Sequence, residues 1–76
     1  MLIDIYAGLI IKLGQTTYNE AWLMNQPEIA HEILLKTRYN YNDCKNNAGK
    51  CMSAFEEQKK INNEYNTIIK SKSLQI

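Results

Sequence analysis

The strongest constraint on this chain is a seven-residue repeat in its second half. Twelve positions recur in alternating steps of four and three without a slip: Ala30, Leu34, Thr37, Tyr41, Cys44, Ala48, Cys51, Phe55, Gln58, Asn62, Tyr65 and Ile69. Positions with this spacing lie on one side of an α-helix. Many of these side chains are small or only weakly apolar, which suits close packing between helices. The repeat predicts an all-α fold whose spine is a long amphipathic helical segment.

Residues 46–50 leave open whether that segment is one helix or two. A break is favoured by Gly49, which can end a helix, and by Ser53 and Glu56, which match the capping box that starts another. Continuity is favoured by the unbroken phase of the repeat. One internal glycine costs a helix only about 1 kcal/mol relative to alanine.

The two alternatives predict different molecules. A break gives helices at residues 27–47 and 53–70, packed as an antiparallel hairpin in a compact monomer. Continuity gives a rod about 60 Å long, at about 1.5 Å per residue. The apolar stripe of such a rod needs a second copy or another protein to cover it. We favour the break and keep a dimer of continuous helices as the alternative.

Residues 2–13 predict a helix that is apolar on most sides. Polar and small residues form one narrow face at helical spacing, so we expect the opposite face to be buried in the core. A strand or short hairpin turning near Gly8 is the alternative. The residues expected on the buried face are Leu2, Ile5, Leu9 and Leu13.

A second, shorter helix is predicted at residues 18–25. Gly14 fits the end of the preceding helix, and Thr17 with Glu20 matches a capping box. Trp22 is expected to anchor this helix in the core. Pro27 then fits the first turn of the next helix.

Length limits the chain to one domain. It has 76 residues, 45% of them hydrophobic, and a chain of this size buries only about 60% of its unfolded surface. We expect one helical domain over residues 1–76, a three- to four-helix bundle or helical hairpin, with a tail at 71–76. Such limited burial also favours self-association or a partner.

Charge and sorting signals disfavour several classes of protein. Nine basic residues oppose eight acidic ones, for a net charge of +1, whereas domains that bind phosphate backbones usually carry a basic excess. The N-terminus lacks the basic region of a signal peptide and has Asp4 where the apolar region should begin. No apolar run approaches the roughly 20 residues of a membrane span. We expect a soluble, cytoplasmic protein that does not engage a membrane.

The two cysteines are expected to be reduced packing residues. Cys44 and Cys51 would lie about 10.5 Å apart in a continuous helix, which is too far for a disulfide within one chain. In a hairpin they would flank the turn and could approach each other. A metal site built from them with His31 and Asp43 lacks the close ligand spacing of zinc sites, so we expect no metal.

No catalytic signature is present, and we expect neither enzymatic activity nor a cofactor. His31 has no accompanying nucleophile in sequence, and the glycines are too scattered to form a phosphate-binding loop. A helix-turn-helix with its turn near Gln26 has suitable proportions. The helix that would enter DNA begins with Glu28 and Glu32, which phosphates repel, so nucleic acid is a disfavoured partner.

The remaining hypothesis is a small module that binds another protein and regulates or inhibits it. The excess of Lys over Arg and the many asparagines are typical of AT-rich genomes, which suggests a phage or mobile element as the source. The alternative is a self-associating structural protein, such as a homodimer. The residues expected to contact a partner are Tyr39, Phe55, Tyr65, Ile68 and Ile69.

Overall fold

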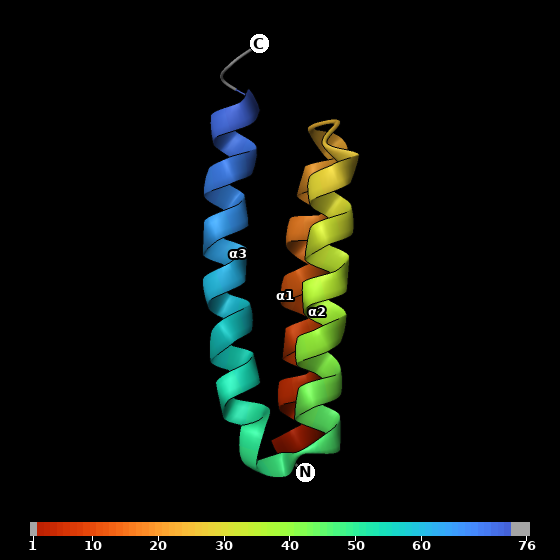
Figure 1. Ribbon diagram of the computed structural model, residues 1–76, viewed down its shortest axis with the longest axis vertical. Helices are drawn as coiled ribbons and strands as arrows, with labels where there is room; N and C mark the ends of the chain where they lie inside the picture. The colour runs from red at the N-terminus through yellow and green to blue at the C-terminus, as the bar shows by residue number, and fades with distance from the viewer. Residues whose placement is uncertain (1, 74–76) are drawn as a thin grey trace.

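The computed structural model describes residues 2–73, and three long helices make up nearly all of this range. Helix α1 spans Leu2–Leu23, α2 spans Pro27–Asn46 and α3 spans Cys51–Ser73, with one 3-10 turn, η1, at Ala48–Lys50. They lie side by side along the 44 Å length of the molecule, and each runs antiparallel to the one before (Figure 1). The predicted all-α fold is confirmed, with three long helices.

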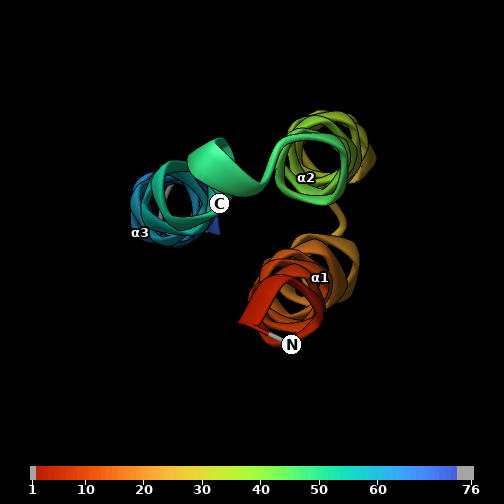
Figure 2. The same ribbon diagram turned by 90° about the horizontal axis from the view of Figure 1, so that it is seen from below.

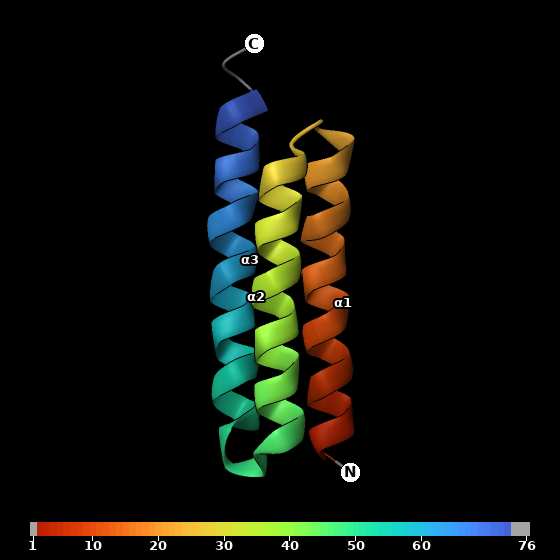
Figure 3. The same cartoon turned by 45° about the vertical axis from the view of Figure 1, so that its right-hand side comes forward.

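Seen end-on, the three helices form a triangle (Figure 2). Each contacts both of the others, and α1 runs parallel to α3 (Figure 3). The core therefore lies along the central axis of the triangle. None of the helices described within residues 2–73 combines the length and the apolarity needed to cross a bilayer.

The predicted break between residues 13 and 18 is wrong, because α1 continues through it. Gly14 lies inside the helix, where a Cβ atom would come within 2.7 Å of the Cβ of Thr37 and closer still to its Oγ1 and Cγ2. Gly14 thus marks a close approach of α1 to α2. Thr17 is fully buried within α1 and caps no helix.

Continuing α1 through Gly14 changes which face of the helix is buried. Ala7, Ile10 and Ala21 join Gly14 and Thr17 on the buried side. The expected core residues Leu2, Ile5 and Leu9 are instead exposed, and so is Trp22, at 52%. Small residues line this side because the two helices approach closely there. Ile10 is the large residue buried on this side, whereas Leu2, Ile5 and Trp22 are exposed.

The turn between α1 and α2 is made by backbone hydrogen bonds around Asn25. Asn25 has a φ of 57°, its N–H donates to the carbonyl of Trp22, and the N–H of Gln26 donates to the carbonyl of Ala21. This pattern is the Schellman motif, in which asparagine can take the left-handed position. Pro27 opens α2 as predicted.

The predicted break in the second half is confirmed, but it lies at Asn47 and not at Gly49. Asn47 is extended, with φ of −146° and ψ of 99°. Its side-chain oxygen accepts from the N–H of Gly49 at 3.1 Å. Helix α3 then begins at Cys51, so Ser53 lies inside the helix and the predicted capping box does not form.

The core consists of two apolar clusters with a polar layer between them. One cluster lies toward the α1–α2 turn: Ala21, Ile29, Ala30, Ile33, Ile61, Tyr65 and Ile69. The other lies toward the α2–α3 turn: Ala7, Ile10, Cys44, Cys51 and Ala54. All members of the sequence repeat are buried or half-buried except Leu34 and Ala48, so the repeat correctly predicts the face that enters the core.

The polar layer is built around Gln58, which is fully buried. Its Nε2 donates to Thr37 Oγ1 at 3.0 Å and to Asn62 Oδ1 at 3.2 Å, while its Oε1 accepts from Asn40 Nδ2 at 2.9 Å. Asn62 Nδ2 donates to the backbone carbonyl of Leu13 at 2.7 Å. These bonds connect all three helices at one level of the bundle.

We expect Gly14→Ala to destabilise the fold and Gly8→Ala to stabilise it. A methyl group at residue 14 must push α2 away from α1, since it meets Thr37 close to that residue's backbone. Overpacking of this kind costs about 1–3 kcal/mol. At residue 8 a Cβ meets nothing within 4 Å, so the substitution keeps only the gain in helix propensity, about 1 kcal/mol. Urea denaturation followed by circular dichroism measures both, and equal effects would contradict this account of Gly14.

We expect Asn62→Leu to lower the free energy of unfolding by roughly 2 kcal/mol. Leucine removes the hydrogen bond from Asn62 to the Leu13 carbonyl and leaves the Nε2 of the buried Gln58 without one acceptor, and an unsatisfied buried group costs about 1–3 kcal/mol. The control is Asn63→Leu, the same change at an exposed neighbour. Equal free energies of unfolding for the two variants would show that the polar layer contributes nothing to stability.

Candidate functional site

An apolar groove lies on the surface between α1 and α2. It has a volume of about 260 Å³. Its lining comes from one side of each helix: Ile11, Gly14, Gln15 and Tyr18 on α1, and Leu34 and Thr37 on α2. Ile11 and Leu34 are 42% and 40% exposed. Two branched apolar side chains therefore face solvent across a narrow cleft.

The groove exists because of the close approach of the two helices beneath it. Gly14 and Thr37, which are both buried, touch at its floor. Tyr18 is half-buried beside the apolar cluster nearest the α1–α2 turn. Its ring packs edge-on against Trp22, with 6.2 Å between the ring centroids. An aromatic pair thus extends the apolar surface from the groove toward that turn.

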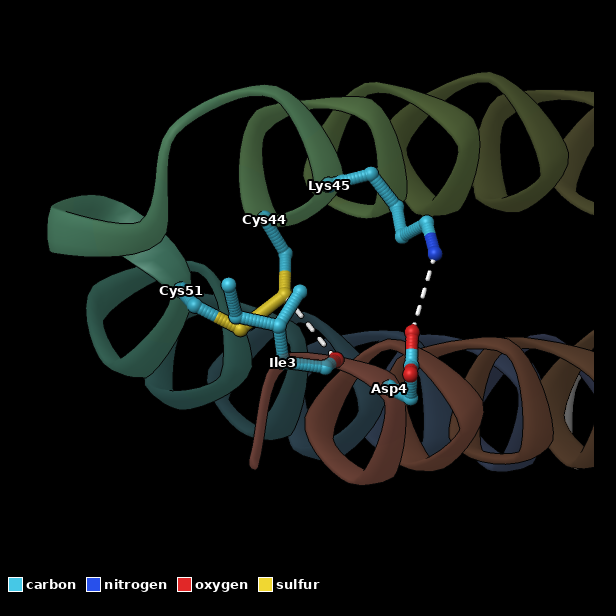
Figure 4. A network of polar contacts seen from close by, with 5 residues as sticks. All are labelled: Ile3, Asp4, Cys44, Lys45 and Cys51. Atoms are coloured by element: carbon cyan, nitrogen blue, oxygen red, sulfur yellow. Dashed lines mark hydrogen bonds and ion pairs between the residues drawn. A yellow bond between two sulfur atoms is a disulfide. The ribbon is translucent and has the colours of Figure 1, made fainter. Parts of the chain in front are cut away.

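An ion pair joins the same two helices toward the α2–α3 turn. Lys45 Nζ donates to Asp4 Oδ1 at 3.0 Å (Figure 4). The hydrogen bond and the charge of Lys45 lower the pKa of Asp4, and the same contact with Asp4 raises the pKa of Lys45. Both groups are exposed, so solvent screens this attraction.

Beside this pair, a disulfide joins Cys44 at the end of α2 to Cys51 at the start of α3 (Figure 4). The expectation of two reduced thiols is not met in this structure, although both cysteines are buried packing residues. Cys44 Sγ lies 3.8 Å from the carbonyl oxygen of Ile3. In a reduced protein the Cys44 thiol could donate to that oxygen.

Two of the five residues predicted to contact a partner lie in the core of the protein. Tyr65 is 8% exposed and Ile69 is 0% exposed, and both belong to the cluster near the α1–α2 turn. They were expected at an interface because a rod-like helix would leave them uncovered. The hairpin turns α3 back onto α1 and α2, which covers them within one chain.

The structure does not bring the other three predicted residues together. Tyr39 is 71% exposed and borders a shallow hollow between α2 and α3 that also includes Ile61. Ile68 is 39% exposed and lies seven residues beyond Ile61, about 10 Å along the helix. Phe55 is half-buried against Tyr6 of α1, with 5.3 Å between the ring centroids.

The groove residues Ile11, Tyr18 and Leu34 were not among the predicted contacts. If residues 2–23 are treated as one helix, Ile11 and Tyr18 are seven apart and share a face. The predicted break at Gly14 hid this spacing. Leu34 was assigned to the core because it belongs to the repeat.

The geometry of α1 and α2 differs from that of a helix-turn-helix. The two helices lie antiparallel along their whole length (Figure 3), whereas the helices of a helix-turn-helix cross at about 90–120°. Within residues 2–73, no group of three or more His, Cys, Asp or Glu side chains is arranged to hold a metal ion.

Comparisons with known proteins do not assign the groove a function. No protein-family model, no curated protein and no solved structure matches this chain.

We expect Lys45→Met to raise the pKa of Asp4 toward its ordinary value. Asp4 has a lowered pKa in the folded protein, so its contribution to stability is present above the unfolded pKa of about 3.9. That contribution is lost as the pH falls through the lower folded value. A carboxyl-detected NMR titration measures the pKa, with Lys50→Met as the control. An Asp4 titration unchanged by Lys45→Met would contradict the ion pair.

Proposed function

We propose that this protein is a non-enzymatic interaction module whose groove between α1 and α2 binds an amphipathic helix of another protein. The observation that carries this proposal is the apolar lining of the groove, with Ile11 and Leu34 exposed on either side. Side chains of this kind gain free energy when a partner removes them from water, at roughly 25 cal/mol for each Å² of apolar surface.

A helix fits this groove better than a small molecule does. At about 260 Å³ the groove is smaller than the roughly 300–1,000 Å³ of typical ligand pockets. It lies between two antiparallel helices, where a further helix can pack at the spacing found in four-helix bundles, about 8–10 Å between axes. The groove would take one large apolar side chain of the partner as its anchor.

The aromatic pair beside the groove supports the same proposal. Tyr18 and Trp22 are the residue types most enriched at the centres of protein interfaces. Trp22 is 52% exposed although it is the one tryptophan of the chain. Its exposure leaves a large aromatic side chain available to a partner beside the groove.

Regulation or inhibition of the bound protein, and an origin in a phage or mobile element, stay predictions from composition and size. Of the residues first expected to contact a partner, the exposed Tyr39 and Ile68 lie outside this groove. Self-association is the second candidate function, and the α2–α3 turn provides the observation that favours it.

We expect Leu34→Glu to abolish capture of the partner while Leu35→Glu preserves it. Both leucines are exposed, at 40% and 50%, and they are adjacent on α2, but only Leu34 lines the groove. A buried charge at the centre of an interface lowers affinity by about tenfold or more. Tagged wild-type and variant proteins are incubated with nuclease-treated lysate of the source organism or its host, and bound proteins are quantified by mass spectrometry.

A partner of the groove is a protein retained by the wild type and by Leu35→Glu and lost with Leu34→Glu. Thermal unfolding of the two variants provides the control for folding, since both substitutions replace exposed side chains. Equal retention of every captured protein by both variants would exclude the groove as the binding site.

A further inference from the structure

Only one residue, Asn47, interrupts helical structure between α2 and α3. Between Pro27 and Ser73, Asn47 is the only described residue outside helical structure, because η1 leads directly into α3. If Asn47 became helical and the 3-10 turn relaxed to an α-turn, residues 27–73 would form one continuous helix. The hydrogen bond from the Gly49 N–H to the Asn47 side chain, at 3.1 Å, holds the turn in its present form.

The sequence repeat suits this continuous helix as well as it suits the hairpin. Its steps of four and three cross the turn without a change of phase. The buried positions of α2 and α3, such as Thr37, Cys44, Cys51 and Gln58, would therefore lie along one stripe of a straight helix. In such a helix the half contributed by α3 no longer reaches its own α1, so a second chain must cover it.

The contacts between α2 and α3 have the symmetry that an exchange between two chains requires. Three observed pairs link residues equally far from the point between Asn47 and Ala48: Cys44 with Cys51, Thr37 with Gln58, and Gln26 with Ile69. Consider two chains whose continuous helices run antiparallel, related by a two-fold axis through that point. Each residue of one chain then lies at the same height along the helices as its partner residue in the other chain. Each contact within one chain can thus form between two chains without a shift of register.

We infer that a second copy of this chain can exchange α3 with the first, giving a dimer of two three-helix bundles joined by continuous α2–α3 helices. Each bundle would contain α1 and α2 of one chain and α3 of the other. The buried polar layer and both apolar clusters would be kept, and only the residues around Asn47 would change conformation. Exchange of an identical element is a low-cost route to a dimer because it needs no new interface.

The disulfide determines which form is available. Within one chain the Cα atoms of Cys44 and Cys51 lie 3.8 Å apart, whereas in a continuous helix they are separated by about 10.5 Å. A disulfide spans at most about 7 Å between Cα atoms, so the bond within one chain holds the hairpin closed. Exchange requires its reduction by a dithiol, which transfers two electrons and two protons to the cysteines and becomes a cyclic disulfide.

In the exchanged dimer, Cys44 of each chain would face Cys51 of the other. Glutathione disulfide can oxidise each facing pair. Two electrons and two protons then pass to glutathione, two molecules of reduced glutathione are released, and one disulfide forms between the chains. The same two cysteines would therefore lock either form, depending on which form is present when they are oxidised.

The experiment measures native mass by light scattering, across a range of protein concentrations, before and after reduction with dithiothreitol. Before reduction, the protein whose disulfide lies within one chain is expected at 8.8 kDa at every concentration. The reduced chain is expected to populate twice that mass as concentration rises. A reduced wild type and a reduced Asn47→Ala variant that both stay monomeric would overturn the inference.

Isotope mixing distinguishes exchange from other dimers. Reduced ¹⁴N and ¹⁵N chains are mixed, the dimer is isolated and oxidised with glutathione disulfide, and trypsin then cleaves at Lys45 and Lys50 between the cysteines. Exchange predicts that about half of the Cys44–Cys51 peptide pairs carry one light and one heavy chain. Pairs derived only from single chains would overturn the inference.

Substitution of Asn47 is expected to favour the dimer. Asn47→Ala removes the acceptor for the Gly49 N–H and favours helix, so it is expected to increase the dimerisation constant about tenfold or more. Asn46→Ala, at the last residue of α2, makes the same substitution without touching that acceptor and serves as the control. Equal dimerisation of these two variants would count against a role for Asn47 in exchange.

Ala48→Pro is expected to abolish the dimer. The extended backbone of Asn47 suits a residue that precedes proline, and residue 48 is the first position of the 3-10 turn. Inside a continuous helix the same proline would clash with the preceding turn. Circular dichroism checks that the monomer keeps its helix content. A reduced dimer that survives Ala48→Pro would show association by another surface and overturn the exchange.

Discussion

The contact between Gly14 and Thr37 determines how the rest of the bundle is arranged. Thr37 can lie against the backbone of α1 only because residue 14 has no side chain. Its hydroxyl then accepts from Gln58 of α3, and Gln58 in turn bonds Asn40 and Asn62. A shift of any helix by one turn would leave these buried groups without partners, at a cost of about 1–3 kcal/mol each. The polar layer therefore selects one register among those that the apolar repeat alone would permit.

The same close approach explains the unusual distribution of apolar residues. The face of α1 in the core is made of Ala7, Ile10, Gly14, Thr17 and Ala21, of which only Ile10 is large. Larger residues of α1 consequently remain on the surface, including Leu2, Ile5 and Trp22. The groove above the Gly14–Thr37 contact is a consequence of this arrangement. The small residues on the buried face of α1 therefore account both for the tight packing against α2 and for the apolar side chains left on the surface.

The sequence predicts the structure correctly where that structure depends on neighbours within one helix. The repeat from Ala30 to Ile69 gives the buried face of α2 and α3 because helical periodicity is a local property. The break that the sequence predicts at Gly14 is wrong, because the role of Gly14 depends on Thr37 in another helix. The predicted break at that glycine then misassigned the buried face of α1 and hid the spacing of Ile11 and Tyr18. Tyr65 and Ile69 were expected at the surface because only the folded hairpin shows what covers them.

The groove and the proposed exchange are physically independent. The groove is formed by α1 and α2, which stay in one chain whether α3 is exchanged or not. An exchanged dimer would therefore carry two intact grooves, one in each bundle, separated by a rigid pair of helices. Two linked sites bind a partner that has two suitable helices with a higher effective affinity than either site alone, without any new contact. Reduction of the Cys44–Cys51 bond would then change the valency of the molecule and leave the chemistry of each site the same.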